Sequence, residues 1–183
     1  MNDTIEQYLA KQEIYELSCR YMRGLDRLDE TLLLSTFSQD AWCEYGFVNC
    51  PAREFVQFAM GALKEHAANQ HMIGNVLIEF DSAEAFDEAF GEVYFNAYHK
   101  VPSSEAGAGS ENSFDDVIIA GRYLDRYVRE DNQWKFAYRS ERVDWSRTQP
   151  TADVYFDQAP DCLRGSRQDD AVYTTQNRRA PAR

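Results

Sequence analysis

The side chains that can exchange protons stand at a few positions far apart along the chain. They are Tyr21 and Asp26 near the end of the first predicted helix, His71 at the start of a predicted strand, and the arginines of the last strands. An imidazole beside a carboxylate acts as a general base, because the carboxylate holds one ring N–H and stabilises the imidazolium that forms. The sequence has no phosphate-binding glycine loop, no G-x-S-x-G elbow and no H-E-x-x-H helix. These patterns favour acid–base chemistry.

The composition excludes several classes of partner. The chain has 183 residues, with 19 Lys and Arg against 31 Asp and Glu, giving a net charge of −12. Such a surface repels phosphate backbones and anionic lipids, so we expect neither nucleic acid nor a membrane as a partner. The apolar runs are too short to cross a bilayer and the first residues do not form a secretory signal. We therefore expect a cytoplasmic protein.

The cysteines predict neither a metal site nor a disulfide. They show no C-x-x-C spacing and no clustering with the three histidines; they are Cys19, Cys43, Cys50 and Cys162. Reduced thiols are the default without an export signal. A chain of this length also buries enough surface to fold without a metal. We expect no metal and no cofactor, and we assign the cysteines no role.

The first half of the chain predicts helices. Apolar positions recur at helical spacing from Thr4 to about Leu25 and again over 52–70, and a short helix fits 30–37. Residues 41–47 are rich in aromatic side chains and predict a short strand. Pro51 separates this strand from the third helix.

The second half predicts long antiparallel strands. Segments rich in Val, Ile, Tyr, Phe and Trp cover 71–80, 85–101, 114–129 and 133–145. Helices followed by strands indicate an α+β fold. We predict one domain over residues 1–145, and over 146–183 a tail that packs on the domain or on a neighbouring subunit.

The order of these elements and three segments resemble the SnoaL-like branch of the nuclear-transport-factor-2-like (NTF2-like) superfamily. The segments are 11–26, with Tyr21-Met22-Arg23-Gly24-Leu25-Asp26, then His71-Met72-Ile73-Gly74-Asn75, and 121–136, from Gly121-Arg122-Tyr123 to Trp134-Lys135-Phe136. The resemblance implies a cone in which a curved antiparallel sheet wraps around the helices and an apolar pocket opens at one end. It also implies dimers or trimers. The fold alone leaves the function open, because members include both enzymes and binding proteins.

The resemblance implies four catalytic residues. In the dehydratase-like and dehydrochlorinase-like members, an Asp that ends the first helix pairs with a His that opens the strand after the third helix; Asp26 and His71 match these positions. Tyr21 matches a proton donor five residues before the Asp, and Arg139 matches a cation on the last strand. On an ideal helix, positions five apart point about 140° from each other, so Tyr21 and Asp26 converge only if the helix loosens near Gly24.

Purely structural roles for Tyr21 and Arg139 stay open as alternatives. Tyr21 could pack in the core with its hydroxyl satisfied, and Arg139 could form a sheet-surface ion pair with Glu141 or Asp125. His66 and His99 are expected at the surface. Polar-tipped side chains of the predicted pocket segments are candidates to bind an aromatic substrate: Trp42, Tyr45, Tyr94, Asn96, Tyr98 and Tyr123.

These expectations lead to a functional hypothesis. His71 removes a proton from a bulky hydrophobic or aromatic substrate, and a leaving group departs with help from Tyr21 or Arg139. The reaction is either a dehydration or a carbon–carbon cleavage that releases formaldehyde, as in the lignin-fragment lyases that the resemblance brings in. A ketosteroid-isomerase-like or cyclase activity is the second hypothesis. A non-catalytic binding module, such as an oxygenase small subunit, is the third.

Overall fold

A computed structural model describes residues 4–81, 87–103, 113–152, 158 and 170–174. The first helix, α1, covers Ile5–Asp26. It begins with a capping box, in which the Gln7 backbone N–H donates to the Thr4 hydroxyl at 3.2 Å and the Thr4 N–H donates to the Gln7 side chain at 2.9 Å. Helices α2 (Glu30–Ser35) and α3 (Ala52–Lys64) follow, and a short α5 covers Ala171–Thr174.

Six strands form one mixed sheet in the order β2-β1-β6-β5-β4-β3. Their bounds are β1 Phe37–Glu44, β2 Asn49–Pro51, β3 Ala68–Phe80, β4 Glu88–Pro102, β5 Phe114–Glu130 and β6 Gln133–Pro150. Neighbouring strands pair antiparallel except β1 and β6, which are parallel. The predicted α+β fold with a curved sheet and leading helices is confirmed, but the sheet is mixed and not wholly antiparallel, because β1 joins β6 in parallel.

Several element boundaries differ from the prediction. The third helix ends at Lys64 instead of residue 70, because the chain enters β3 at Ala68. The strand predicted over 41–47 begins at Phe37. Strand β6 continues to Pro150, five residues past the predicted end of the domain at 145. Most of the predicted tail, including Cys162, lies outside the described residues.

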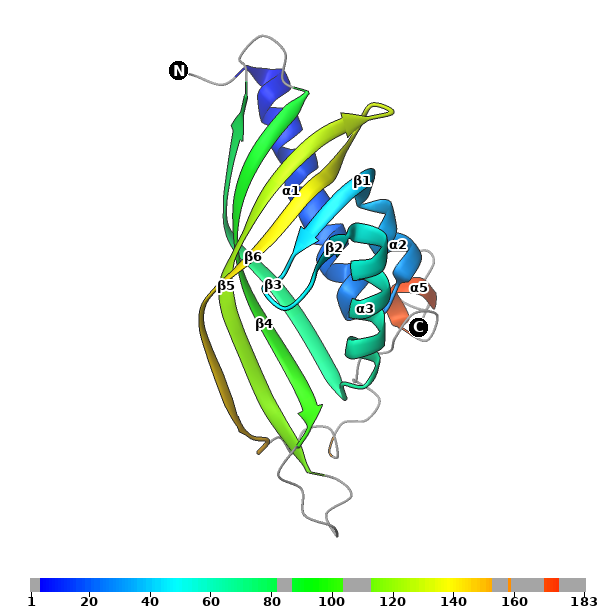
Figure 1. The fold of residues 1–183 in the computed structure, drawn as a ribbon, viewed down its shortest axis with the longest axis vertical. Helices are drawn as coiled ribbons and strands as arrows, with labels where there is room; N and C mark the ends of the chain where they lie inside the picture. Colours follow the sequence, from blue (N-terminus) through cyan, green and yellow to red (C-terminus); the bar gives the residue numbers. More distant parts are fainter. Residues whose placement is uncertain (1–3, 82–86, 104–112, 153–157, 159–169, 175–183) are drawn as a thin grey trace, which may run out of the picture.

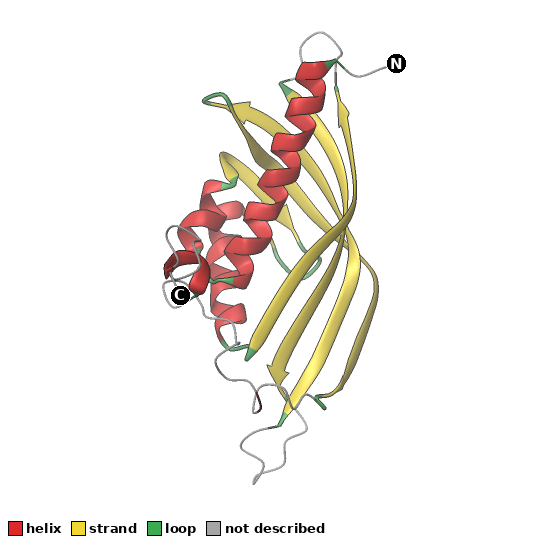
Figure 2. Ribbon diagram, turned by 180° about the vertical axis from the view of Figure 1, so that it is seen from behind, coloured by secondary structure: helices red, strands yellow, loops and turns green. Residues whose placement is uncertain are grey.

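The sheet twists strongly, and the helices lie on one of its faces (Figures 1 and 2). Helix α1 runs along the sheet, and α2 and α3 pack beside its C-terminal half. A tight turn joins β5 to β6, with Asp131 and Asn132 at φ values of 48° and 60°. Both residues tolerate this left-handed region, which two-residue hairpin turns require. No helix among the described residues is long and apolar enough to span a membrane.

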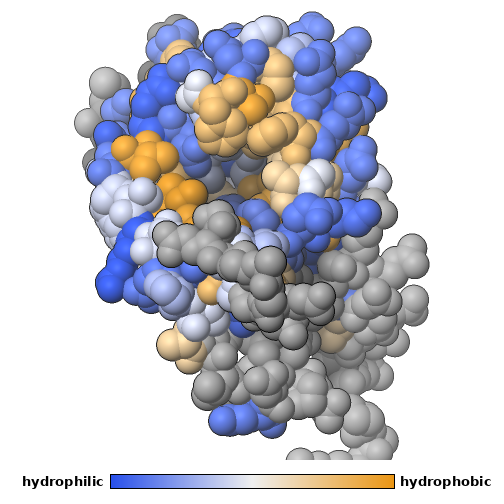
Figure 3. Space-filling model, turned by 60° about the horizontal axis from the view of Figure 1, so that its bottom comes forward, coloured by the Kyte–Doolittle hydropathy of each residue, from blue (hydrophilic) through white to orange (hydrophobic). Residues whose placement is uncertain are grey.

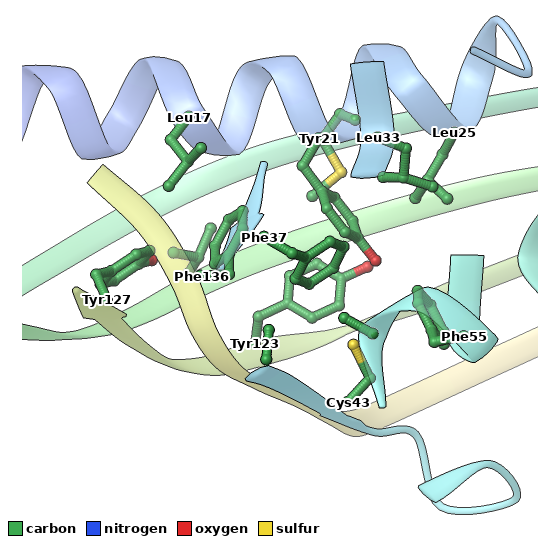
Figure 4. Close-up of a cluster of buried hydrophobic side chains, with 14 of the residues drawn as sticks. Leu17, Tyr21, Leu25, Leu33, Phe37, Cys43, Phe55, Tyr123, Tyr127 and Phe136 are labelled. Carbon is green, nitrogen blue, oxygen red and sulfur yellow. The ribbon is translucent and has the colours of Figure 1, made fainter. Parts of the chain in front are cut away.

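The core lies between α1 and the sheet and is rich in aromatic rings (Figure 4). Tyr21 points from α1 toward the sheet, and its ring meets Phe37, Tyr123 and Phe136 with centroids 5.6–6.3 Å apart. Aromatic pairs in these edge-on arrangements add to the free energy gained by burial. The aromatic content therefore fills the interior of the cone.

The outer face of the sheet carries apolar side chains that are exposed to solvent. Leu77, Phe90, Tyr94 and Leu124 are 37–58% exposed. Three of them, Leu77, Phe90 and Leu124, line a groove of about 410 Å³. Self-association stays a prediction, which light scattering of the purified chain tests.

A bulge between Ala120 and Gly121 interrupts the pairing of β5 with β6. A Cβ added at Gly121 would stand 2.1 Å from the Arg142 carbonyl oxygen. Only glycine allows the two backbones to approach so closely, and bulges bend the strand in which they occur. Gly121 is therefore required where β5 and β6 meet at the bend.

We expect Gly121→Ala to lower the free energy of unfolding by about 1–3 kcal/mol, because the new methyl overlaps a backbone oxygen that cannot move away. Gly61→Ala is the matched control: it lies inside α3 with no atom within 4 Å of the added Cβ. That control should raise the free energy of unfolding by about 0.5–1 kcal/mol. Denaturant unfolding of both variants measures the difference, and equal stabilities would contradict the prediction.

Candidate active site

Asp26 and His71 meet where the end of α1 lies beside the edge strand β3. The His71 Nδ1 lies 2.7 Å from an Asp26 carboxylate oxygen. The His71 backbone N–H also donates to both Asp26 oxygens, at 3.1 and 3.0 Å. Because a carboxylate only accepts, Nδ1 carries the hydrogen and Nε2 of the neutral ring is left bare. The two side chains are 10% and 6% exposed, so the pair is shielded from bulk water.

The location of Asp26 is electrostatically unusual. It is the last residue of α1, where the helix dipole disfavours a negative charge. Three contacts from His71 compensate for this cost. Gly24 helps to set the geometry of this end, since an added Cβ would stand only 2.9 Å from that of Leu33 in α2. The chain turns back sharply here and leaves Asp26 facing β3.

A second imidazole, His99, lies beside this pair, which corrects the predicted surface location of His99. It is 8% exposed, and its ring centroid lies 5.1 Å from that of His71. Burial lowers the pKa of His99 to about 3, and the charges of His71 and His66 act in the same direction. His99 is therefore uncharged at neutral pH. His66 is half-buried and its ring lies 5.1 Å from His99, so its predicted solvent-side location is also wrong.

Glu141 is a further titratable side chain that interacts with His71, and the sequence did not predict it as a site residue. It pairs in register with Tyr123, whose side chain is buried inside the cone. Burial raises the pKa of Glu141, while the charges of His71 and Arg139 partly oppose the rise. Burial of this half-buried carboxyl therefore disfavours its charged form.

Arg139 is fully buried and forms an ion pair with Asp125. Its Nε and Nη2 donate to the two carboxylate oxygens at 2.8 Å each. The guanidinium also lies 4.0–4.2 Å from the ring centroids of Tyr21, Tyr123 and Phe136. Burial alone would lower the pKa of Arg139, but the Asp125 charge and hydrogen bonds hold it above its usual value. Of the two interpretations of Arg139, the ion pair is present, although it lies in the core and not on the sheet surface.

One nitrogen of this guanidinium stays unpaired. Nη1 is buried and has no hydrogen-bond partner among the described residues. It is the part of Arg139 that is left to bind another oxygen or an anion. The role of Arg139 toward a leaving group stays a prediction.

Tyr21 and Tyr45 form a buried hydroxyl pair whose oxygens lie 2.5 Å apart. Burial raises the pKa of both phenols, so both keep their protons at neutral pH. Helix α1 stays regular through Gly24 to Asp26, so Tyr21 and Asp26 do not converge through a loosened helix end. Tyr123 is buried as well, with its ring stacked on Phe95 at 4.4 Å.

Four predicted substrate-binding residues do not line an inner cavity. Tyr94 and Asn96 are exposed, because Val93, Phe95 and Ala97 are the residues of β4 that face the core. The Tyr98 hydroxyl donates to Asp116 at 2.8 Å. Trp42 is 42% exposed and its indole N–H donates to Asn49. The predicted location of all four inside the pocket is wrong by strand parity.

A cavity of about 520 Å³ adjoins the Asp26–His71 pair. Its lining comes from one side of α1, from β3 and from α5: Cys19, Met22, Arg23, Asp26, Arg27, His71, Met72, Ile73, Asp170 and Val172. Helix α5 is tied to this wall, since Arg27 pairs with Asp170 at 3.0 Å and the Tyr173 hydroxyl donates to Asp29 at 2.7 Å. The volume lies in the range of small-molecule sites.

Two further observations concern ligands. Seen from the end of the molecule in Figure 3, apolar side chains surround a hollow. Among the described residues, no group of three or more His, Cys, Asp or Glu side chains is arranged to hold a metal ion. Cys19, Cys43 and Cys50 are free thiols.

Comparisons with known proteins agree with this architecture. A candidate scytalone dehydratase from Novosphingobium aromaticivorans is 22% identical, with a TM-score of 0.64 over 77% of this chain and 88% of its own. Hexachlorocyclohexane dehydrochlorinase LinA-type3 from Novosphingobium barchaimii is 21% identical, with a TM-score of 0.65 over 82% and 95%. A protein of unknown function with a cystatin-like fold from Nostoc punctiforme is 23% identical, with a TM-score of 0.59 over 79% and 96%. These likenesses show the fold.

No curated protein matches the chain in sequence. The family model of the SnoaL-like domain matches residues 6–140. This range covers α1 from its second residue, α2, α3, strands β1 to β5 and β6 as far as Ser140, so it includes Asp26, His71 and Arg139. The chain therefore belongs to the SnoaL-like domain family, within the NTF2-like superfamily.

Proposed function

We propose that this protein is a lyase in which His71 is the general base and Asp26 orients it. The observation that carries the proposal is the 2.7 Å contact between His71 Nδ1 and the Asp26 carboxylate. This contact keeps the bare Nε2 available to accept a proton and stabilises the imidazolium that results. The shielding of both side chains from water strengthens the attraction between the charges that form.

In the proposed elimination, each bond that breaks supplies the electron pair for a new bond or leaves with the departing group. His71 Nε2 takes a proton from a carbon of the substrate, and the C–H electron pair becomes the new double bond. The leaving group departs from the adjacent carbon with its own bonding pair. The imidazolium then returns the proton to the leaving group or to water. In the carbon–carbon cleavage, His71 takes the proton from a substrate hydroxyl, and the O–H electron pair becomes the C=O bond of the released formaldehyde. The electron pair of the broken C–C bond becomes the new C=C double bond as the leaving group departs from the adjacent carbon.

The proposed substrate is bulky and largely apolar, with an aromatic or steroid-like ring. The cavity of about 520 Å³ supports this size, and Met22, Ile73 and Val172 supply apolar lining. Two proteins of similar fold are named as a candidate scytalone dehydratase and a hexachlorocyclohexane dehydrochlorinase, and both names denote eliminations. Tyr21 and Arg139 stay the proposed groups for the departing oxygen or anion. Neither lines this cavity and both are fully buried, so this role requires the leaving group to reach past the cavity lining into the core.

A small substrate panel tests the proposal. The purified chain is incubated with scytalone, γ-hexachlorocyclohexane and a 1-aryl-propane-1,3-diol, and dehydration, chloride and formaldehyde are followed. We expect turnover of at least one compound, and we expect His71→Gln to lower that rate by about 10²–10⁴-fold. Gln70→Ala is the control, since Gln70 is exposed on the neighbouring position of β3.

Each outcome separates the hypotheses. A product with the mass of the substrate would favour the isomerase or cyclase. Full turnover by His71→Gln would contradict the assignment of the base. Binding of the compounds without any turnover would favour the non-catalytic binding module.

A further inference from the structure

Two of the three histidines, His66 and His99, contact one asparagine, and the third, His71, packs against the His99 ring. The Asn69 side-chain oxygen lies 2.7 Å from His66 Nδ1 and 2.9 Å from His99 Nδ1. The Asn69 amide nitrogen donates to the Leu63 carbonyl at 3.2 Å. This last bond fixes which end of the amide faces the rings, so the oxygen is the atom that both imidazoles contact. Asn69 is itself buried, at 3% exposure.

The asparagine determines the hydrogen positions on two rings. An amide oxygen only accepts hydrogen bonds, so both His66 and His99 carry a hydrogen on Nδ1. A neutral His99 therefore has a bare Nε2, as His71 has on the other side. The two rings meet nearly edge-on, at an interplanar angle of 74°.

The surroundings differ in charge between the two rings. His71 pairs with the Asp26 carboxylate of α1. Among the described residues, the hydrogen-bond partner of the His99 ring is the Asn69 amide oxygen, and the charges that act on this ring are those of His71 and His66. Glu141 of β6 interacts with the charge of His71. A positive charge is thus stabilised on His71 and not on His99.

We propose that Asn69 is a positioning residue that holds His99 in the Nδ1–H form, so that His99 Nε2 is a second acceptor beside the base. In the proposed lyase, on which this role rests, the proton removed from the substrate then stays on His71, and His99 accepts a hydrogen bond from a substrate hydroxyl. Burial keeps the second ring neutral, and an amide at position 69 adds no negative charge that would oppose this effect. An aspartate there would pair with two imidazoles and draw a proton onto them.

Nitrogen NMR of ¹⁵N-histidine-labelled protein tests the charge and hydrogen positions without any substrate. The three histidines give three sets of ring signals. In the native chain we expect His99 to show the Nδ1–H tautomer and no titration between pH 5 and 8. An Nε2–H tautomer, or a cationic His99 at pH 7, would overturn the proposal even if no variant folds.

The variant Asn69→Asp adds the sharper test. We expect the His99 titration to move upward into the neutral range, whereas Gln70→Glu, which adds the same charge on an exposed neighbouring residue, should leave it unmoved. If the His99 pKa rises to about 8, roughly one molecule in ten keeps a neutral ring at pH 7, so kcat should fall about tenfold. The activity of this variant should recover as the pH is raised.

The outcomes separate this inference from the proposed function. Unchanged His99 signals in Asn69→Asp would overturn the positioning role, whatever the substrate panel shows. Changed signals with a full and pH-independent rate would overturn the role of a neutral His99 in the reaction. A protein without any turnover but with the expected signals would leave the positioning role standing and refute the lyase.

Discussion

Asp125→Asn should lower the free energy of unfolding by about 3–5 kcal/mol. The change removes the carboxylate that accepts two hydrogen bonds from Arg139 at 2.8 Å, in a place where both side chains are fully buried. The guanidinium would then be a charge in the core without a counter-charge, flanked by three aromatic rings that compensate only in part. Denaturant unfolding at pH 7 measures the loss.

Two further variants show whether the pairing is the cause. Glu92→Gln removes a carboxylate that pairs with Arg122 at 3.3 Å on the exposed outer face, and it should cost less than about 1 kcal/mol. The double variant Asp125→Leu with Arg139→Met removes both charges and should be more stable than Asp125→Asn alone. If Asp125→Asn costs no more than Glu92→Gln, the buried pair does not stabilise the fold.

Asp26→Asn should lower the rate of the proposed reaction by about 10²–10⁴-fold. An amide has one oxygen, and the His71 backbone N–H donates to the residue at this position. The amide nitrogen is then left to donate to Nδ1, which moves the ring hydrogen to Nε2 and blocks the base. The measurement is kcat with a substrate found in the panel.

The control for this change is Glu16→Gln. Glu16 is an exposed acid of α1 that pairs with Arg20 at 3.8 Å, away from the cavity lining. Like Asp26→Asn, the substitution Glu16→Gln removes one negative charge from α1, and it should leave the rate unchanged. A full rate in Asp26→Asn would mean that the carboxylate does not set the hydrogen position of His71.

The sequence was sufficient to predict that the ends of the first helix and of the edge strand carry Asp26 and His71. The helical spacing of apolar residues is unambiguous in α1, and the family resemblance aligned the strand. The faces of β4 were not predictable in the same way. Tyr94 and Tyr98 alternate with Val93, Phe95 and Ala97, so large apolar groups occupy both faces and alternation does not choose the inner one.

The neighbours of the dyad depend on features that local patterns do not contain. His66 and Asn69 were assigned to a helix, because α3 has helical spacing up to residue 70, but the pairing of β3 with β4 ends the helix early. Asn69 then stands opposite His99 in register. In the same way, Arg139 meets Asp125 only because β5 and β6 pair those two positions. Both contacts are set by strand register, which a single sequence does not fix.

The Asp26 carboxylate, which we propose to orient the base, also limits strand pairing between molecules. Strand β3 is the last strand of the sheet, and its outward N–H groups are able to recruit a strand from another chain. Asp26 occupies the N–H of His71 with both oxygens and so interrupts that row of donors near the beginning of β3. Removing this side chain would leave the His71 N–H of the edge strand unpaired. We then expect aggregation on storage in addition to the loss of the proposed activity.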